Sequence, residues 1–154
     1  MFWVNIMSEK TLLMIKPDAV QRSLIGRIIS RIEEKGLKII GLKLIQLSES
    51  EIDQLYDIHI GKSFYPLLKS FIISGPVVVI AIKGNNAVKV VRKLAGLTNS
   101  PEADPGTIRG DFGLDLTKNI VHASDAVDRA QYELDVVFKV HELVKYELIN
   151  KAWL

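Results

Sequence analysis

Apolar residues recur along the chain with two periods, which predict alternating strands and helices. Consecutive or alternating apolar residues at 11–15, 37–47, 77–82 and 120–123 predict four strands. Apolar residues at helical spacing predict helices over 24–36, 48–60, 64–72, 87–96 and 127–138. This order fits an α+β, ferredoxin-like fold with a four-stranded antiparallel sheet and flanking helices. The pattern alone leaves other α/β arrangements open.

Local signals mark several boundaries of these elements. Ser48 with Glu51 predicts a capping box at the start of a helix. The alternation in strand 37–47 shifts near Gly41, which predicts a β-bulge. Ser124 and Asp125 are residue types that cap helices, so the last main helix is expected to start directly after strand 120–123.

Residues 97–118 show neither period and predict a long loop before the last strand. A loop of this length inside a compact domain is usually functional or disordered. Its apolar side chains are few, and Pro105 with Gly106 predicts a sharp turn within it. The segment is therefore a candidate part of a binding site.

Composition limits the classes of protein that fit. A length of 154 residues predicts one domain over residues 1–154, and 48% hydrophobic residues suffice for a core. The net charge of +2 comes from 20 basic and 18 acidic residues and gives no reason to expect a nucleic-acid or membrane partner. The sequence contains no cysteine, which excludes disulfides, thiol catalysis and zinc–thiolate sites.

Targeting and membrane signals are weak. The longest apolar stretch, 71–82, is interrupted by Ser74-Gly75-Pro76 and is too short to span a bilayer. Residues 1–7 are largely apolar but have no basic flank, so they are interpreted as an N-terminal extension and not as a signal peptide. A cytoplasmic location without a membrane partner is expected.

His122 is the strongest candidate for chemistry. It closes a β-branched strand and precedes a helix start, where backbone N–H groups and the helix dipole favour anions. A neutral imidazole in that place can attack phosphorus. Lys16 ends an apolar strand, and Arg109 lies in the loop 97–118. One nucleophile with separate cations indicates phosphoryl transfer, whereas His59 and His141 are expected to be surface or packing residues.

A set of short motifs carries a family resemblance. They occur in the order Ile15-Lys16-Pro17-Asp18, Gln21-Arg22, Ser74-Gly75-Pro76-Val77, Thr98-Asn99, residues 105–112 and residues 119–125. In this order and spacing, from about Lys10 to the C-terminus, the chain resembles the nucleoside diphosphate kinase family. The resemblance implies reversible ping-pong transfer of the γ-phosphoryl group of a nucleoside triphosphate to a nucleoside diphosphate, through a phosphohistidine.

The resemblance also implies roles for individual residues. His122 would become phosphorylated, Glu133 would orient its ring, and Tyr56 would lie close to the phosphohistidine. The residues that would contact phosphate are Lys16, Arg92, Thr98 and Arg109. The residues that would bind the nucleoside are Asn119 with Lys16 at the sugar, and Phe64, Leu116 and Leu68 at the base. Apolar contacts with a base accept every base, because each has a π-face.

Cofactor and partners follow from the same resemblance. Mg²⁺ is expected to arrive on the nucleotide, with Asp125 acting at most through water. A homohexamer is expected, with a tetramer as the second possibility. The competing function is a ferredoxin-like nucleotide- or RNA-binding module without catalysis. Strand 77–82 contains no aromatic residue of the kind that such modules stack on RNA, so no specific nucleic acid is expected.

Overall fold

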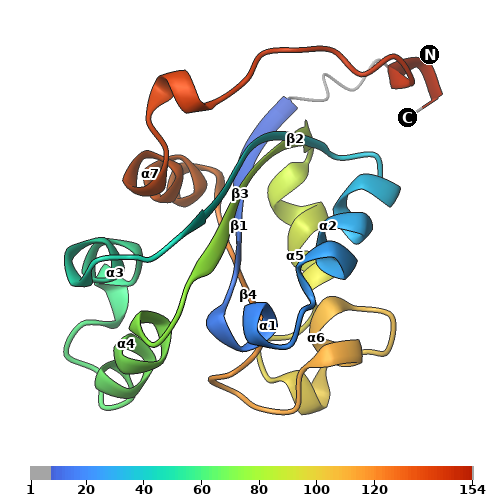
Figure 1. Cartoon of the computed structure of the whole chain (residues 1–154). Coiled ribbons are helices and arrows are strands. Elements are labelled where there is room, and N and C mark those ends of the chain that lie inside the picture. Colours follow the sequence, from blue (N-terminus) through green and yellow to red (C-terminus); the bar gives the residue numbers. More distant parts are fainter. Residues whose placement is uncertain (1–7, 154) are drawn as a thin grey trace.

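A four-stranded antiparallel sheet forms the centre of the computed structural model, which describes residues 8–153 (Figure 1). The strands are β1 (Ser8–Ile15), β2 (Lys38–Ile45), β3 (Val77–Asn85) and β4 (Val121–Ala123), in the order β2-β3-β1-β4. β1 pairs with β3 along its whole length and with β4 at its end, where Met14 lies opposite His122. The predicted ferredoxin-like α+β fold is confirmed, while the extension at residues 1–7 lies outside the described residues.

Helices cover both faces of this sheet. Figure 1 shows α1 (Pro17–Gln21), α2 (Ile25–Glu34), α5 (Ala87–Ala95) and α6 (Ile108–Phe112) on one side. The helices on the other side are α3 (Glu49–Leu55), α4 (Tyr65–Ile73) and α7 (Val127–Val137). Short 3₁₀ helices lie at Asp57–His59, Ser100–Glu102, Val140–Glu142 and Lys151–Trp153. Among the described residues, no helix has the length and apolarity that crossing a membrane requires.

The alternation of side chains along β1 divides the core in two. Leu13 and Ile15 pack with α2 and α5 on one face, and Leu12 and Met14 pack with α3, α4 and α7 on the other. All six residues 77–82 of β3 are buried as well. RNA-binding modules of this topology need an open sheet face on which bases stack. In the part of the chain that the structure describes, helices cover both faces of the central strands, which disfavours the binding-module alternative.

Two of the predicted local features are confirmed. Ser48 Oγ accepts a hydrogen bond from the Glu51 amide at 3.2 Å, and Glu51 Oε2 accepts one from the Ser48 amide at 2.8 Å. The pairing of β2 with β3 shifts register between Ile39 and Gly41, as the predicted bulge requires. A Cβ atom at Gly41 would lie 2.9 Å from side-chain atoms of Leu143 and Phe138, so a larger residue would not fit without displacing them.

Two predicted boundaries are wrong. The helix after Ser48 ends at Leu55 instead of continuing to residue 60, and a 3₁₀ helix follows it. The last main helix begins at Val127 with Ala126 as its N-cap, so neither Ser124 nor Asp125 caps it. The Ser124 hydroxyl instead donates to a carboxylate of the site, and this explains why a capping residue type stands there without capping.

The long loop predicted over residues 97–118 is present between α5 and β4, but it is not irregular throughout. The segment contains the 3₁₀ helix Ser100–Glu102 and helix α6, whose N-cap Thr107 accepts from the Gly110 amide at 3.0 Å. A five-residue helix is too short to display a helical period. The turn predicted at Pro105 and Gly106 is present, and Gly106 has a φ of 91°, which favours glycine.

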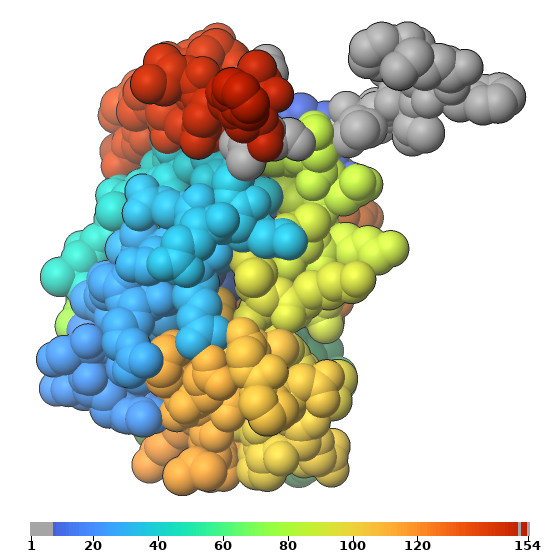
Figure 2. Space-filling model, turned by 90° about the vertical axis from the view of Figure 1, so that its right-hand side faces the viewer, coloured from blue at the N-terminus to red at the C-terminus, as the bar shows by residue number. Residues whose placement is uncertain are grey.

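Helix α2 and the end of α1 hold the α6 segment in place. Arg31 donates to the Gly106 carbonyl at 2.6 Å and pairs with Asp111, while Arg22 donates to the Phe112 carbonyl at 2.6 Å. The guanidinium of Arg27 lies 4.7 Å from the centre of the Phe112 ring. In Figure 2 this segment, in orange, packs directly against the blue N-terminal helices. Because α6 carries Arg109, these contacts determine where that side chain points.

Candidate active site

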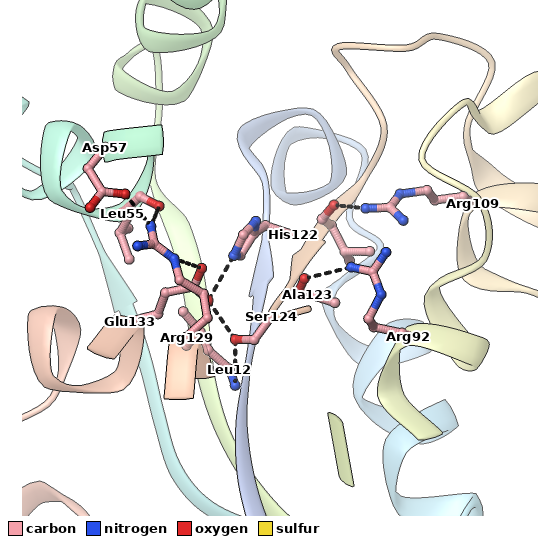
Figure 3. A network of polar contacts seen from close by, with 11 residues as sticks. Leu12, Leu55, Asp57, Arg92, Arg109, His122, Ala123, Ser124, Arg129 and Glu133 are labelled. Atoms are coloured by element: carbon pink, nitrogen blue, oxygen red, sulfur yellow. Dashed lines mark hydrogen bonds and ion pairs between the residues drawn. The ribbon is translucent and has the colours of Figure 1, made fainter. Parts of the chain in front are cut away.

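His122 lies in the middle of β4, and its pairing with Met14 in the central strand β1 fixes its backbone. Its side chain is 19% exposed, and its Nε2 lies 3.0 Å from Glu133 Oε2 (Figure 3). A carboxylate accepts hydrogen bonds, so this contact requires a proton on Nε2. The second ring nitrogen, Nδ1, is thereby left with a lone pair for attack on an electrophile.

Glu133 reaches His122 from helix α7 and is itself buried. Its Oε2 also accepts from Ser124 Oγ at 2.5 Å, and its Oε1 accepts from Arg129 Nε at 3.2 Å. Burial opposes ionisation of this carboxyl, but the bonds from His122 and Ser124 and the charge of Arg129 outweigh burial and lower the pKa of Glu133. A fixed, ionised carboxylate therefore lies on one side of the imidazole.

Tyr56 forms the neighbouring wall at the C-terminal end of α3. Its ring meets the His122 ring edge-on, with the ring centres 5.4 Å apart. The hydroxyl is buried and has no hydrogen-bond partner among the described residues. Burial and the charge of Glu133 raise the pKa of Tyr56 well above its usual range. The phenol therefore stays protonated and can donate a hydrogen bond to an anion in the site.

Lys16 lies at the end of β1, where the chain enters α1. Its Nζ donates to Asn119 Oδ1 at 2.7 Å, in a position that is 5% exposed. Burial, together with the nearby charge of Arg109, lowers the pKa of Lys16 to about 7. This ammonium group is therefore only partly protonated near neutral pH and gains from an anionic ligand.

The turn before His122 is strained. Ile120 has a φ of 75°, which a β-branched residue rarely adopts. Three contacts hold this turn: the Ile120 amide donates to Asp18 at 3.1 Å, the Ile120 carbonyl accepts from the Lys16 amide at 2.9 Å, and the Val121 amide donates to the Asn119 carbonyl at 2.8 Å. Strain of this kind persists where the surroundings over-determine a conformation, and here it places Asn119 beside Lys16.

Arg109 and Arg92 approach His122 from the opposite side to Glu133 (Figure 3). Arg109 is buried, and its guanidinium donates to the carbonyls of Gly96 at 2.8 Å, Val121 at 2.7 Å and Asn119 at 3.2 Å. Burial and the charge of Arg92 lower the pKa of Arg109 to about 10, so it remains charged at neutral pH. Arg92 is exposed and donates to the Ala123 carbonyl at 3.3 Å.

A single cavity of about 450 Å³ brings the predicted site residues together. Its lining includes every residue predicted from the sequence to act in the site: Lys16, Tyr56, Phe64, Leu68, Arg92, Thr98, Arg109, Leu116, Asn119, His122, Asp125 and Glu133. Phe64 and Leu116 are 49% and 61% exposed, so each still presents apolar surface to a ligand, while Lys16, Tyr56 and Arg109 are buried. The cavity thus combines a charged interior with exposed apolar side chains.

Three residues of the site escaped the sequence analysis. His59, expected at the surface or in packing, lines the cavity between Tyr56 and Phe64, with ring centres 6.1 Å and 5.3 Å away. Its position three residues after Tyr56 was the available signal. Ser124 was assigned to capping, and the spacing of four between Arg129 and Glu133 on α7 was overlooked. His141 is exposed and outside the cavity, as expected.

Ligand binding at Lys16 should take up a proton at mildly alkaline pH. The Lys16 pKa of about 7 leaves its amine mostly neutral at about pH 8, and a bound phosphate favours the ammonium form. Titration of ADP calorimetrically, in buffers of different ionisation enthalpy, should show uptake approaching about one proton at that pH. ADP affinity should fall as pH rises above 7, and Lys16→Gln should abolish the uptake. Equal proton counts in both proteins would contradict this.

Comparison with known proteins supplies the family. The family model for nucleoside diphosphate kinase matches residues 9–143. Curated nucleoside diphosphate kinases from Staphylococcus epidermidis and from Roseiflexus sp. are 52% and 47% identical over 146 residues, which cover 95% of this chain and 98% of each relative.

Solved structures agree with these relatives. A nucleoside diphosphate kinase from Halobacterium salinarum in complex with CDP is 43% identical, with a TM-score of 0.93, and the match covers 96% of this chain and 98% of that one. A nucleoside diphosphate kinase family protein from Babesia bovis is 43% identical with a TM-score of 0.91, covering 94% and 98%. Together with the matching fold, these findings show that this chain belongs to the nucleoside diphosphate kinase family and is an enzyme of that type.

Proposed function

We propose that this enzyme transfers the γ-phosphoryl group of a nucleoside triphosphate to His122 and then to a nucleoside diphosphate, reversibly. The observation that carries this proposal is the 3.0 Å contact between His122 Nε2 and buried Glu133, which leaves the lone pair on Nδ1 of a ring that lines the same cavity as Lys16, Arg92 and Arg109. A nucleophile needs a free lone pair and a group that orients it. The carboxylate is the orienting group here.

The proposed phosphoryl transfer takes place in two steps. In the first, Nδ1 of His122 attacks the γ-phosphorus, a P–N bond forms, and the bond to the bridging oxygen of the leaving diphosphate breaks. Glu133 holds the Nε2 proton and stabilises the ring as it becomes cationic. In the second, a terminal β-phosphate oxygen of the incoming diphosphate attacks the phosphorus, and the P–N bond breaks.

The cations of the site stabilise charge on the transferred group. That group spreads negative charge over its equatorial oxygens, which Lys16, Arg92 and Arg109 would contact. Three carbonyls already fix the guanidinium of Arg109, so little reorganisation accompanies the reaction. The Tyr56 hydroxyl, which lacks a partner among the described residues, and Thr98 would donate to phosphate oxygens.

Magnesium fits the site as a companion of the nucleotide. In the described part of the chain, no group of three or more His, Asp or Glu could hold a metal ion. Mg²⁺ usually keeps several waters and takes phosphate oxygens with one or two carboxylates. Asp125, which lines the cavity, is the carboxylate that would hold it through water. When bound with the nucleotide, the ion would supply positive charge that offsets part of the negative charge of the phosphates.

The sugar and the base of the nucleoside would contact different residues of the cavity. Asn119 with Lys16 would bond the sugar hydroxyls, and Phe64 and Leu116 would contact the two faces of the base, with Leu68 beside them. The Halobacterium salinarum relative in complex with CDP supports a nucleotide as the ligand.

Discrimination among bases should be low. The side chains assigned to the base are apolar and carry no donor or acceptor for a base edge, and stacking is tolerant of base identity. Initial rates with ATP, GTP, CTP and dTTP as phosphoryl donors should give kcat/KM values within about two decades of one another. A spread of four decades would mean that another group reads the base edge.

The assembly proposed for this enzyme is a homohexamer, with a tetramer as the second possibility, in the cytoplasm. Exposed apolar side chains support an assembly: Leu114 is 89% exposed, and Leu42 and Leu44 lie exposed on the edge strand β2. Exposed leucines and an edge strand are surfaces that a neighbouring subunit would cover.

Replacement of Pro105 by serine should weaken this assembly. Pro105 opens the turn in which Gly106 adopts its positive φ and accepts from Arg31. Serine gives the unfolded chain more conformational freedom and should cost about 1 kcal/mol. Thermal unfolding and sedimentation equilibrium should show a lower Tm and more dissociated subunits. A fully active wild-type monomer at micromolar concentration would contradict the proposed assembly.

Steady-state kinetics test the proposed reaction. A double-displacement route releases the first product before the second substrate binds, so double-reciprocal plots of rate against ATP at several dTDP concentrations should be parallel. Intersecting lines would indicate direct transfer within a ternary complex. An absence of transfer, with nucleotide still bound, would favour the binding-module alternative.

A further inference from the structure

The guanidinium of Arg129 connects three elements around the site (Figure 3). Arg129 lies one turn before Glu133 on α7, and its Nε donates to Glu133 Oε1 at 3.2 Å. Its Nη2 donates to the Leu55 carbonyl at 2.7 Å and pairs with Asp57 Oδ1 at 2.8 Å. The side chain is 18% exposed. Helix α7 is thereby tied to the end of α3 and to the 3₁₀ helix that follows.

These contacts fix the wall beside the imidazole. Leu55 and Asp57 are the two neighbours of Tyr56, whose ring lies edge-on to His122. The last carbonyls of a helix lack intrahelical partners and carry partial negative charge, so an arginine there is favourable. By binding both neighbours of Tyr56, Arg129 restrains the position of the phenol relative to His122.

The same guanidinium restrains the carboxylate. Glu133 Oε2 accepts from His122 and Ser124, whereas Oε1 accepts from Arg129. Loss of that donor would leave Oε1 buried without a hydrogen bond from Arg129. This loss favours rotation of the Glu133 carboxylate about its Cγ–Cδ bond. Rotation would move Oε2 away from His122 Nε2.

We propose that Arg129 is a positioning residue for phosphoryl transfer, which holds Glu133 in the orientation that binds His122 Nε2 and holds Tyr56 beside the ring. The inference rests on the proposed function, because it takes His122 as the nucleophile. Arg129 also lines the cavity, so direct contact with the nucleotide is the competing role. Its Nε and Nη2 donors are already directed at Glu133, Leu55 and Asp57, which favours the positioning role.

The ring nitrogens of His122 report this arrangement without any turnover. Nitrogen-15 NMR of the histidine side chains distinguishes the Nε2–H from the Nδ1–H tautomer in the unliganded full-length protein. The wild-type protein should hold His122 as the Nε2–H tautomer. Arg129→Gln should give a mixture of tautomers, because Glu133 is no longer held. Lys145→Gln removes the same charge from an exposed residue outside the cavity and should leave the tautomer unchanged.

Kinetics separate positioning from nucleotide contact. Single-turnover phosphorylation by ATP should be slower in Arg129→Gln by about 10- to 100-fold, as for other supporting contacts, while ADP affinity is unchanged. Arg129→Lys keeps the charge, but its single nitrogen lacks the planar fork that reaches Glu133, Leu55 and Asp57 from separate nitrogens, so it should restore only part of the rate. Asp57→Asn should keep the tautomer and lose a smaller part of the rate, since Arg129 still binds Glu133.

The outcomes decide between the roles. A folded Arg129→Gln protein with the wild-type tautomer and rate would overturn the proposal, and so would a loss of ADP affinity with the tautomer unchanged. If Arg129→Gln does not fold, an unchanged tautomer and rate in Arg129→Lys would overturn it. Failure of wild-type protein to accept phosphate would overturn the proposed function, while the tautomer comparison would still decide whether Arg129 orients Glu133 and His122.

Discussion

Replacement of His122 by alanine should abolish phosphoryl exchange between nucleoside triphosphates and diphosphates. His59 is the other described histidine in the cavity, but Glu133 bonds His122, whereas Nδ1 of His59 lies 3.3 Å from the Lys62 ammonium group. Without the nucleophile, a double-displacement route has no first step, and loss of a catalytic nucleophile costs on the order of 10⁶-fold in turnover. The purified variant should show no exchange above background in a coupled assay.

Nucleotide binding should survive in the same variant. The cations and apolar side chains of the cavity come from other elements, so calorimetry should find ADP affinity near that of the wild type. His141→Ala is the matched control, because His141 is exposed and lies outside the cavity. That control should retain full activity. Substantial turnover by purified His122→Ala would exclude this residue as the obligatory nucleophile.

Glutamine at position 133 should slow phosphorylation of His122 without preventing it. Glutamine keeps the length of the side chain but removes the charge that stabilises the ring as it becomes cationic. A carboxylate accepts at both oxygens, whereas an amide carries an NH₂ group in place of one of them. That NH₂ group would face a donor, either Arg129 Nε or the two donors of His122 and Ser124, and the hydrogen bonds on that side would be lost. Rapid-quench single-turnover measurements with ATP should show a loss on the order of tens-fold to a thousand-fold.

A matched change on the same helix controls for the chemistry of the substitution. Asp128 is exposed on α7 and lies outside the cavity, so Asp128→Asn should leave the single-turnover rate unaltered. An unaltered rate in Glu133→Gln as well would show that the contact with His122 is structural and that the ring is oriented by other groups.

Most of the fold could be predicted from the sequence because its elements are long enough to show a period. The apolar run in strand 11–15 and the apolar faces of helices 24–36 and 87–96 correspond to observed elements. α1 and α6 escaped prediction because five residues span little more than one turn. The missed helix α6 matters for the site, because it positions Arg109.

The site was harder to predict than the fold, because its members converge only after folding. Lys16 and Asn119 bond at 2.7 Å although 103 positions separate them, and no local pattern reports such a contact. The family resemblance assigned these residues, and the cavity contains all of them. Ser124 and Arg129 were missed because both donate to the buried carboxylate of Glu133, a contact that forms only in the folded protein. From the sequence alone, serine at 124 is a typical capping residue and arginine at 129 a typical surface residue.

Direct chemical analysis of the protein after exposure to γ-labelled ATP and Mg²⁺ tests the central claim most sharply. The account predicts a label that acid removes and alkali does not, as expected of a phosphohistidine, on the peptide that contains His122. Added nucleoside diphosphate should discharge this label and yield labelled triphosphate. Exchange by wild-type protein that never carries the label, or a label on a residue other than His122, would contradict the account.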